Sequence, residues 1–163
     1  YSEAFLVTFF SSIIAKNIPW VGHRSIETMG LGALLHDIGT LLLDDDIRDE
    51  HPALLSDDSF NKFKEHPLLG IQATTNISGI NEGVRMIIQH HHEHVNGTGY
   101  PLGLTSHKIY PLAKVVSLSD GFVSFLKKHA MTPIQGAKEF LMNQHIIDQY
   151  DAELVKNLIM GIK

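Results

Sequence analysis

Residues 89–101 read QHHHEHVNGTGYP, which places four histidines and one acid directly before a loop with two glycines and a proline. Imidazole and carboxylate groups are the usual protein ligands of zinc, iron and manganese. Gly97, Gly99 and Pro101 mark a tight turn that a helix does not cross. The stretch therefore predicts a histidine-rich helix end that runs into a shaped loop, with a metal site beside it.

The composition is that of a folded, single-domain protein. The chain has 163 residues, of which 44% are apolar and 19% are charged, so one domain with a full core is expected. The net charge of -5 argues against a general nucleic-acid surface, and no DNA partner is predicted. The chain has no cysteine, so any metal must be held by nitrogen and oxygen.

The apolar spacing predicts an all-α domain, a bundle of roughly seven helices with one long Gly/Pro loop over residues 95–107. The seven longer helices are expected over residues 2–16, from about 22 or 25 to 36, and over 67–77, 81–92, 109–128, 133–143 and 152–160. A short helix is also expected from residue 57. The last two are expected to pack the core and to carry no catalytic group. No apolar run is long enough to span a bilayer, so direct membrane insertion is not predicted.

Three further positions carry groups that are unusual for their surroundings. His36 and Asp37 follow an apolar helix, and two interpretations stay open: a helix cap with a solvated acid, or a pair of ligands. His66 precedes Pro67, which suits the first turn of a helix, and is expected just outside that helix. Asp120 lies in an apolar run, where an acid is either paired or bound to a metal.

Other histidines and acids are better explained without a metal. Residues 44–46 are three aspartates, which are more typical of a solvated turn or helix start than of a ligand set. His90 and His94 are expected to point away from the site. His91 and His92 are neighbours, about 100° apart on a helix, so both reach one site only near a helix end or with two ions.

Together these positions supply six nitrogen and oxygen ligands: His36, Asp37, His66, His91, His92 and Asp120. Six ligands are more than one tetrahedral ion needs, and they suit two close ions that share Asp37 as a bridge. Two such ions can polarise a phosphate and generate a bridging hydroxide for in-line attack, which makes Asp37 the candidate catalytic residue.

The order of these motifs resembles the HD-GYP domain, a branch of the HD phosphohydrolase superfamily. The motifs that carry the resemblance are HDIG at residues 36–39, HPLLG at 66–70, HHE at 91–93, NGTGYPLGL at 96–104 and SD at 119–120. The resemblance implies a helical bundle, two or three iron or manganese ions, and a cytoplasmic phosphodiesterase acting on cyclic di-GMP. It also implies linkage to an N-terminal domain, and since the chain begins at Tyr1, residues 1–163 are expected to be one domain cut from a longer chain.

Carried over position by position, the six residues above match the family's metal ligands, and Asp37 matches the bridging carboxylate. Tyr100 and the turn with Gly97 and Gly99 match the loop beside the site, which is expected to contact substrate. The same loop, residues 95–107, is a candidate surface for a protein partner.

The sequence also departs from the family pattern. Residues 1–5, YSEAF, stand where the family has a first-helix histidine, so the site is expected to lack one ligand or to hold two ions. Thr40 replaces a lysine and Asn96 replaces an aspartate. Residues 121–128, GFVSFLKK, replace an arginine-containing segment, so Lys127 and Lys128 become the candidate phosphate contacts, without the bidentate geometry of arginine.

Two hypotheses follow from the kept ligands and the changed surroundings. The first is an active phosphodiesterase for cyclic di-GMP or a related nucleotide. The second is a degenerate, weakly active or inactive domain that binds metal or nucleotide and transmits a signal to a partner.

Overall fold

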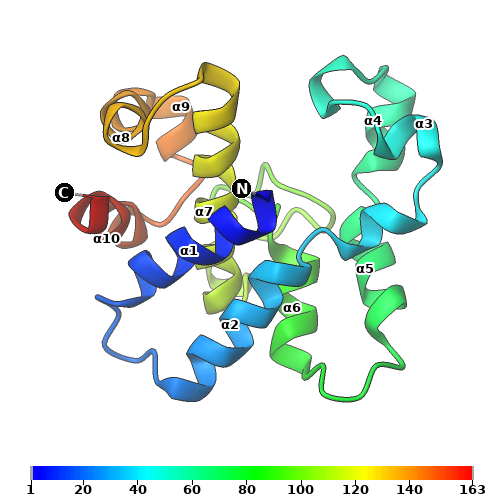
Figure 1. Ribbon diagram of the computed structural model, residues 1–163, viewed down its shortest axis with the longest axis horizontal. Coiled ribbons are helices and arrows are strands. Elements are labelled where there is room, and N and C mark those ends of the chain that lie inside the picture. The colour runs from blue at the N-terminus through cyan, green and yellow to red at the C-terminus, as the bar shows by residue number, and fades with distance from the viewer. Residues whose placement is uncertain (1, 163) are drawn as a thin grey trace.

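The computed structural model describes residues 2–162, which form an all-α fold, as predicted (Figure 1). Across these residues the backbone forms no named strand, and one antiparallel bridge joins Asn96 to Thr105. The α-helices are α1 (Glu3–Ala15), α2 (His23–Leu35), α3 (Asp45–Arg48), α4 (Asp57–Phe63), α5 (His66–Thr74), α6 (Glu82–His90), α7 (Pro111–His129), α8 (Pro133–Met142), α9 (Gln144–Ile147) and α10 (Ala152–Ile162). Short 3₁₀ segments lie at η1 (Ile38–Leu42), η2 (Pro52–Leu54) and η3 (Ser106–Lys108).

Helix α7 lies at the centre of the fold, with α1, α2, α6, α8 and α10 packed around it (Figure 1). Its apolar residues are buried almost all round, which is the pattern of a helix enclosed by others. Phe122 of α7 packs edge-on against Phe10 of α1 and Phe140 of α8, with ring centroids 5.1 and 5.4 Å apart. The core therefore fixes α7, and with it Asp120, relative to its neighbours.

Several helix ends meet beside α7. Helix α2 ends at Leu35, α6 ends at His90 and α5 begins at His66, so the predicted ligands leave or enter helices at one place. Gly39 of η1 lies so close to α5 that a Cβ atom there would overlap the His66 carbonyl and the Gly70 amide. A glycine is therefore needed at residue 39 to bring the segment that carries Asp37 against His66.

Helix boundaries differ from prediction in small ways. His66 is the first residue of α5, with Glu65 at its N-cap, whereas it was expected just outside the helix. Ser56, whose side chain accepts from the Ser59 amide, caps α4. Helix α9 was not predicted, because its four residues include no buried one and so show no apolar period.

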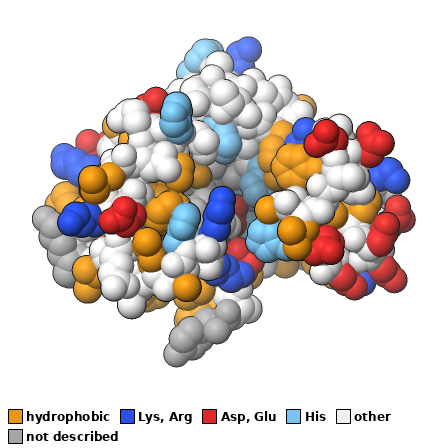
Figure 2. All heavy atoms as spheres, turned by 90° about the horizontal axis from the view of Figure 1, so that it is seen from above, with side chains coloured by type: hydrophobic (Ala, Val, Ile, Leu, Met, Phe, Trp, Pro, Cys, Tyr) orange, Lys and Arg blue, Asp and Glu red, His pale blue; other side chains and the backbone are white. Residues whose placement is uncertain are grey.

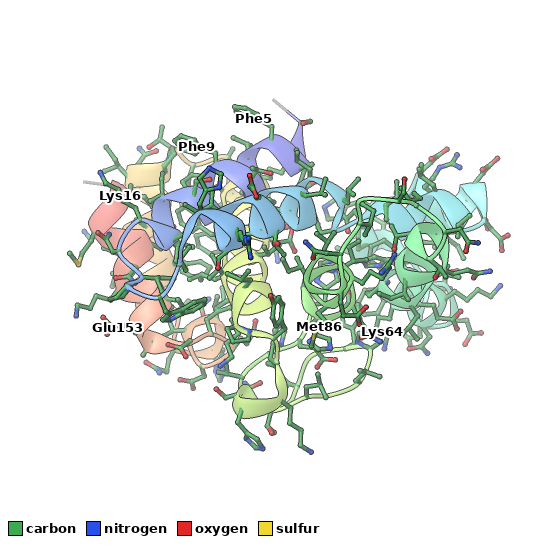
Figure 3. The ribbon with its side chains drawn as sticks, turned by 90° about the horizontal axis from the view of Figure 1, so that it is seen from below. Phe5, Phe9, Lys16, Lys64, Met86 and Glu153 are labelled. Atoms are coloured by element: carbon green, nitrogen blue, oxygen red, sulfur yellow. The ribbon has the colours of Figure 1, made fainter. Side chains whose placement is uncertain are left out.

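The outer surface differs from the core in packing. Helices α3 and α4 stand apart from the central bundle, and Ile47 is the one buried residue that they contribute (Figure 1). Phe5 and Phe9 of α1 lie half-exposed on the surface of the bundle (Figure 3). No helix within residues 2–162 combines the length and apolar character needed to cross a bilayer.

Candidate metal centre

A cleft of about 1250 Å³ opens between two walls. One wall comes from residues 48–63, around α3 and α4, and the other from α7 and the segments on either side of α9. Figure 2 shows the hollow between the two parts of the molecule, with acidic side chains gathered over the α3–α4 side. Asp37, His92, Tyr100 and Asp120 line the cleft between these walls.

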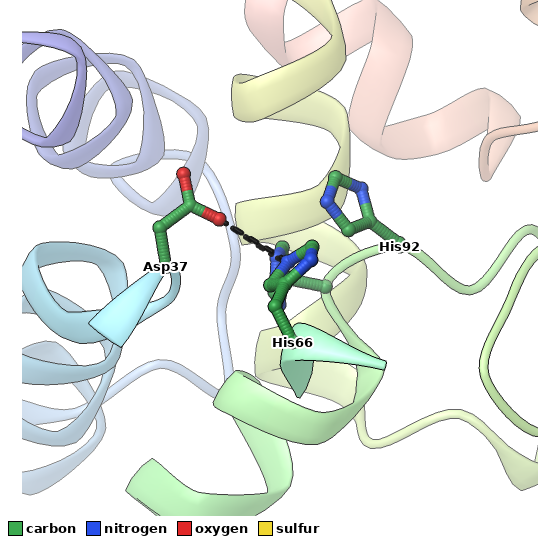
Figure 4. Close-up of side chains that lie close together, drawn as sticks. Asp37, His66 and His92 are labelled. Carbon is green, nitrogen blue, oxygen red and sulfur yellow. Dashed lines mark hydrogen bonds and ion pairs between the residues drawn. The ribbon is translucent and has the colours of Figure 1, made fainter. Parts of the chain in front are cut away.

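Four of the six predicted ligands form one tight group at the bottom of the cleft, here called its floor. The candidate ligand atoms of Asp37, His66, His91 and His92 all lie within 4.8 Å of one another. Asp37 Oδ1 lies 3.3 Å from His66 Nε2 and 3.4 Å from His91 Nε2 (Figure 4). The structure thus brings together the N-cap residue of η1, the first residue of α5 and the two residues that follow α6.

His36 and Asp120 adjoin this group on its other side. His36 Nε2 lies 3.0 Å from Asp37 Oδ2 and 3.7 Å from Asp120 Oδ1. His92 Nδ1 lies 3.7 Å from Asp120 Oδ2. The two interpretations of His36 are compatible, because it is both the C-cap residue of α2 and a buried member of the cluster.

The histidine tautomers follow from the backbone. The Nδ1 atoms of His36, His66 and His91 lie 2.7, 2.8 and 2.7 Å from the carbonyl oxygens of Ala33, Phe63 and Ile88. A carbonyl oxygen only accepts, so each Nδ1 carries a proton, and in its neutral form each ring presents a bare Nε2 to the cluster.

When the rings are neutral, these nitrogens and the Asp37 carboxylate face one another without protons between them. His66 Nε2 and His91 Nε2 are 3.2 Å apart, and His36 Nε2 is buried without a hydrogen-bond partner. Converging lone pairs repel unless a cation lies among them, and backbone-anchored imidazoles are typical of metal sites. The residues present therefore fit metal ions.

Burial sets the protonation of the ring pair at the end of α6. Burial lowers the pKa of His91 to about 4 and that of His92 well below its ordinary value. Both rings are therefore neutral near pH 7, which is the form that binds metal.

The carboxylates have opposite shifts. Burial disfavours the charge of Asp37, but His36 holds its pKa well below the usual range. Burial raises the pKa of Asp120 to about 7, with His36 opposing the shift. Burial also lowers the pKa of His36, yet Asp37 and Asp120 raise it overall to about 9, so without metal a proton occupies that corner.

His90 and His94 lie outside the cluster, as expected. The Tyr110 amide donates to His90 Nδ1 at 3.2 Å, and His94 Nδ1 lies 3.1 Å from the Thr98 hydroxyl. His90 is buried, so it is a structural histidine and not a solvated one.

Sequence reasoning missed the role of Glu93. Its two carboxylate oxygens accept from the Leu102 and Leu104 amides, each at 2.7 Å, and the side chain is buried. Glu93 thereby ties the loop over residues 95–107 to the end of α6. The position of Glu93, directly between His91–His92 and the loop, was the feature of the sequence that could have indicated this role.

The predicted substrate-binding residues of the loop separate into two kinds. Tyr100 lines the cleft and stacks on His92 with ring centroids 4.6 Å apart. Gly97 has a φ of +80°, and a Cβ on Gly99 would overlap the His92 carbonyl and the His94 amide. These glycines shape the loop, while Tyr100 is the residue that lines the cleft.

The cations on the cleft walls are mostly paired. Lys127 Nζ lies 2.6 Å from Glu3 Oε2, and Arg48 pairs with Asp45 and Asp49 at 2.9 and 2.8 Å. Lys128 also lines the cleft and has no ion pair within residues 2–162.

The first residues of the chain can be placed in part. Tyr1, where the family's histidine pattern begins, lies outside the described residues. Glu3 lines the cleft, which the sequence interpretation did not anticipate. Asn143, Gln149 and Tyr150 also line it, so the closing segments do more than pack the core.

Comparison with known proteins agrees with the fold. The sequence profile of a family described as "HD domain" matches residues 13–154. The chain therefore belongs to the HD domain family, as a divergent member of its HD-GYP branch.

Individual relatives are more specific. The chain is 35% identical over 95 residues to the cyclic di-GMP phosphodiesterase PA4108 of Pseudomonas aeruginosa, covering 58% of this chain and 23% of that protein. It is 28% identical over 129 residues to the cyclic di-GMP phosphodiesterase response regulator RpfG of Xanthomonas campestris, covering 77% and 33%. The solved structure of Bd1817, a HDG"Y"P protein from Bdellovibrio bacteriovorus, matches with a TM-score of 0.80 at 23% identity, over 97% of this chain and 50% of that one.

Proposed function

We propose that the chain is a metal-dependent phosphodiesterase that hydrolyses cyclic di-GMP. The observation that carries the proposal is the convergence of three backbone-anchored Nε2 atoms on the Asp37 carboxylate at the floor of a large cleft. Relatives named as cyclic di-GMP phosphodiesterases support the substrate. Because the chain spans about a quarter to a third of their length, activity of the isolated domain is part of the proposal.

The six candidate ligands fall into two groups around Asp37, and this arrangement fits two ions better than one. Asp37 turns Oδ1 toward His66 and His91 and Oδ2 toward His36, which is the arrangement expected of a bridging carboxylate. Asp37, His66, His91 and His92 would hold one ion, and His36, Asp37 and Asp120 the other. Nitrogen and oxygen ligands without sulfur suit iron or manganese.

Ions bound there would supply Lewis acidity toward phosphate oxygens and lower the pKa of a bound water. The protein's own contribution is orientation: Asp37 and Asp120 set the spacing of the ligands, and Tyr100 flanks them on the cleft side. The cleft of about 1250 Å³ is larger than the ~300–1,000 Å³ of common small-molecule pockets, so a dinucleotide is a reasonable occupant. Lys128 is the wall cation proposed to contact phosphate.

The test is turnover of cyclic di-GMP by the purified chain loaded with manganese or, without oxygen, with ferrous iron. Chromatography of the products should show hydrolysis that stops when a chelator removes the metal and resumes when metal is restored. Metal-loaded protein that binds the nucleotide and leaves it intact would contradict the enzyme proposal.

That second outcome is the signature of the alternative, a domain that binds metal or nucleotide and signals to a partner. The pairing of Lys127 with Glu3, and of Arg48 with its neighbouring aspartates, favours the alternative, because it leaves few free cations to grip phosphate. In either case we propose a cytoplasmic domain of a longer protein with an additional N-terminal domain. The loop over residues 95–107 is the surface proposed to meet a protein partner.

A further inference from the structure

Tyr150, between α9 and α10, lines the cleft that holds the candidate ligands, among them Asp37 and Asp120. Its ring stacks on Phe140 with centroids 5.9 Å apart and meets His94 at 6.0 Å. The adjacent Gln149 carbonyl accepts from the Val95 amide at 2.9 Å, which joins this segment to the start of the loop. The tyrosine is thus held by both the core and the loop.

The tip of Tyr150 occupies a space that Gly121 leaves open. A Cβ atom on Gly121 would overlap the Tyr150 hydroxyl, so the two positions are sterically matched. Gly121 directly follows Asp120 in α7, and both lie on the cleft. A glycine after the candidate ligand therefore admits a phenol hydroxyl beside it.

This hydroxyl has an unused hydrogen-bond capacity. Within residues 2–162 it has no hydrogen-bond partner, although it lies at a cleft surface among buried rings. The ordinary pKa of a phenol is about 10, so the hydroxyl keeps its proton near neutral pH and can donate. A neutral phenol donor beside a candidate metal cluster is suited to a ligand that carries acceptor oxygens and also binds the metal.

We propose that the Tyr150 hydroxyl donates a hydrogen bond to a phosphate oxygen of the ligand bound beside Asp120. The inference rests on the proposed function, because it requires a phosphoryl group at the metal cluster. It assigns part of the phosphate grip to an uncharged donor, on a wall where Lys127 is already paired with Glu3. Tyr150 and Tyr100, 50 positions apart in the sequence, then both contact the ligand.

The direct test measures binding of inorganic phosphate to the manganese-loaded chain by calorimetry. Tyr150→Phe removes the hydroxyl and keeps the ring, so phosphate affinity should fall about tenfold, as expected for one hydrogen bond to a charged group. Tyr110→Phe is the matched control, since Tyr110 does not line the cleft, and it should leave phosphate affinity unchanged. Manganese content and thermal unfolding should be the same in all three proteins.

A second variant tests the steric match. Gly121→Ala should displace the hydroxyl and weaken phosphate binding by a similar factor. In the Tyr150→Phe background, Gly121→Ala should add little, because the atom that it would displace is absent. Independent, multiplying effects of the two substitutions would contradict the inference.

The Tyr150 contact and the proposed hydrolysis of cyclic di-GMP are overturned by different results. Equal phosphate affinity of wild type and Tyr150→Phe overturns the role of Tyr150, even if the wild type hydrolyses cyclic di-GMP. Conversely, absence of turnover by the wild type, with a tenfold phosphate difference between the two proteins, overturns the enzyme proposal and supports the Tyr150 contact. A manganese-loaded wild type that binds no phosphate overturns the inference.

Discussion

The floor of the cleft and its walls are built differently. The floor, defined by the six predicted ligands, joins the ends of α2, α5 and α6 to the middle of α7, and three of its four histidines are anchored to backbone carbonyls. The walls, residues 48–63 on one side and residues 121–150 on the other, carry cations that are largely matched with the chain's own acids. The floor is thus prepared for cations, while the walls have little free positive charge for an anion.

This difference shows which part of the site the fold itself determines. Any chain that packs α2, α5, α6 and α7 in this way brings the ligands together, because the core sets the helix ends. The walls depend on side chains that the core does not constrain, so recognition of substrate can diverge while the ligand set is kept.

The largest effect is expected from Asp37→Ala. Loss of the carboxylate that faces both halves of the floor should weaken metal binding by more than about 100-fold, since even outer partners of ligands contribute 10–100-fold. Elemental analysis of the purified protein is the measurement. Asp58→Ala, an exposed acid that does not line the cleft, is the matched control. Full metal occupancy in Asp37→Ala would show that the floor does not depend on Asp37 to bind metal.

The next effect concerns the link between floor and loop. Glu93→Ala removes the acceptor of two amide hydrogen bonds and should lower the free energy of unfolding by about 3 kcal/mol. Denaturant unfolding measures the loss, and hydrogen exchange should show faster exchange at the Leu102 and Leu104 amides.

The control for this experiment is Glu153→Ala. Glu153 is an exposed acid paired with Lys156 at 3.2 Å, and its removal should change stability by no more than about 0.5 kcal/mol. Unchanged protection of the loop amides in Glu93→Ala would show that the loop is held from elsewhere.

Metal binding should strengthen with pH. His36 has a pKa of about 9 in the metal-free fold, above its ordinary 6.5, because Asp37 and Asp120 outweigh the effect of burial. Metal must displace this proton, so apparent affinity should rise about tenfold per pH unit from pH 7 toward 9 and then level off. Calorimetry in buffers of different ionisation enthalpy counts the protons released.

The stability of the metal-free protein should change with pH in the direction opposite to metal affinity. A folded pKa above the unfolded one stabilises the fold fully below pH 6.5, and that contribution is lost as pH rises through about 9. Metal-free protein should therefore lose stability over this range while metal affinity increases. Metal affinity that is flat with pH would indicate that His36 is not a ligand.

The floor could be predicted from sequence because most of its members are anomalous in their local context. Asp120 is anomalous by itself because it lies in an apolar run, whereas His66 became a candidate only because it lies between two other histidine features. The all-α fold followed from the apolar period and is confirmed. The role of each ligand stays a prediction, although the six residues do converge.

The wall residues could not be predicted in this way. Tyr150 is ordinary in its own segment, and its position beside Gly121 depends on how α7, α8 and α9 pack. Glu3 meets Lys127 across 124 positions of sequence, a pairing that no local pattern encodes. Local chemistry identifies groups that require a partner, while tertiary packing decides which other groups come near them.

The smallest expected effect concerns the ion pair between Glu3 and Lys127 beside the cleft. Glu3→Gln removes the acid that pairs with Lys127 and frees a cation beside the cleft. Affinity for cyclic di-GMP should rise about threefold, in line with the weak energy of a half-exposed ion pair, and the gain should shrink in high salt. Glu153→Gln frees Lys156 outside this cleft and should leave affinity unchanged. If Glu3→Gln instead lowers metal content, Glu3 acts with the floor and not with the wall, because a residue that only neutralises a lysine has no reason to affect metal binding.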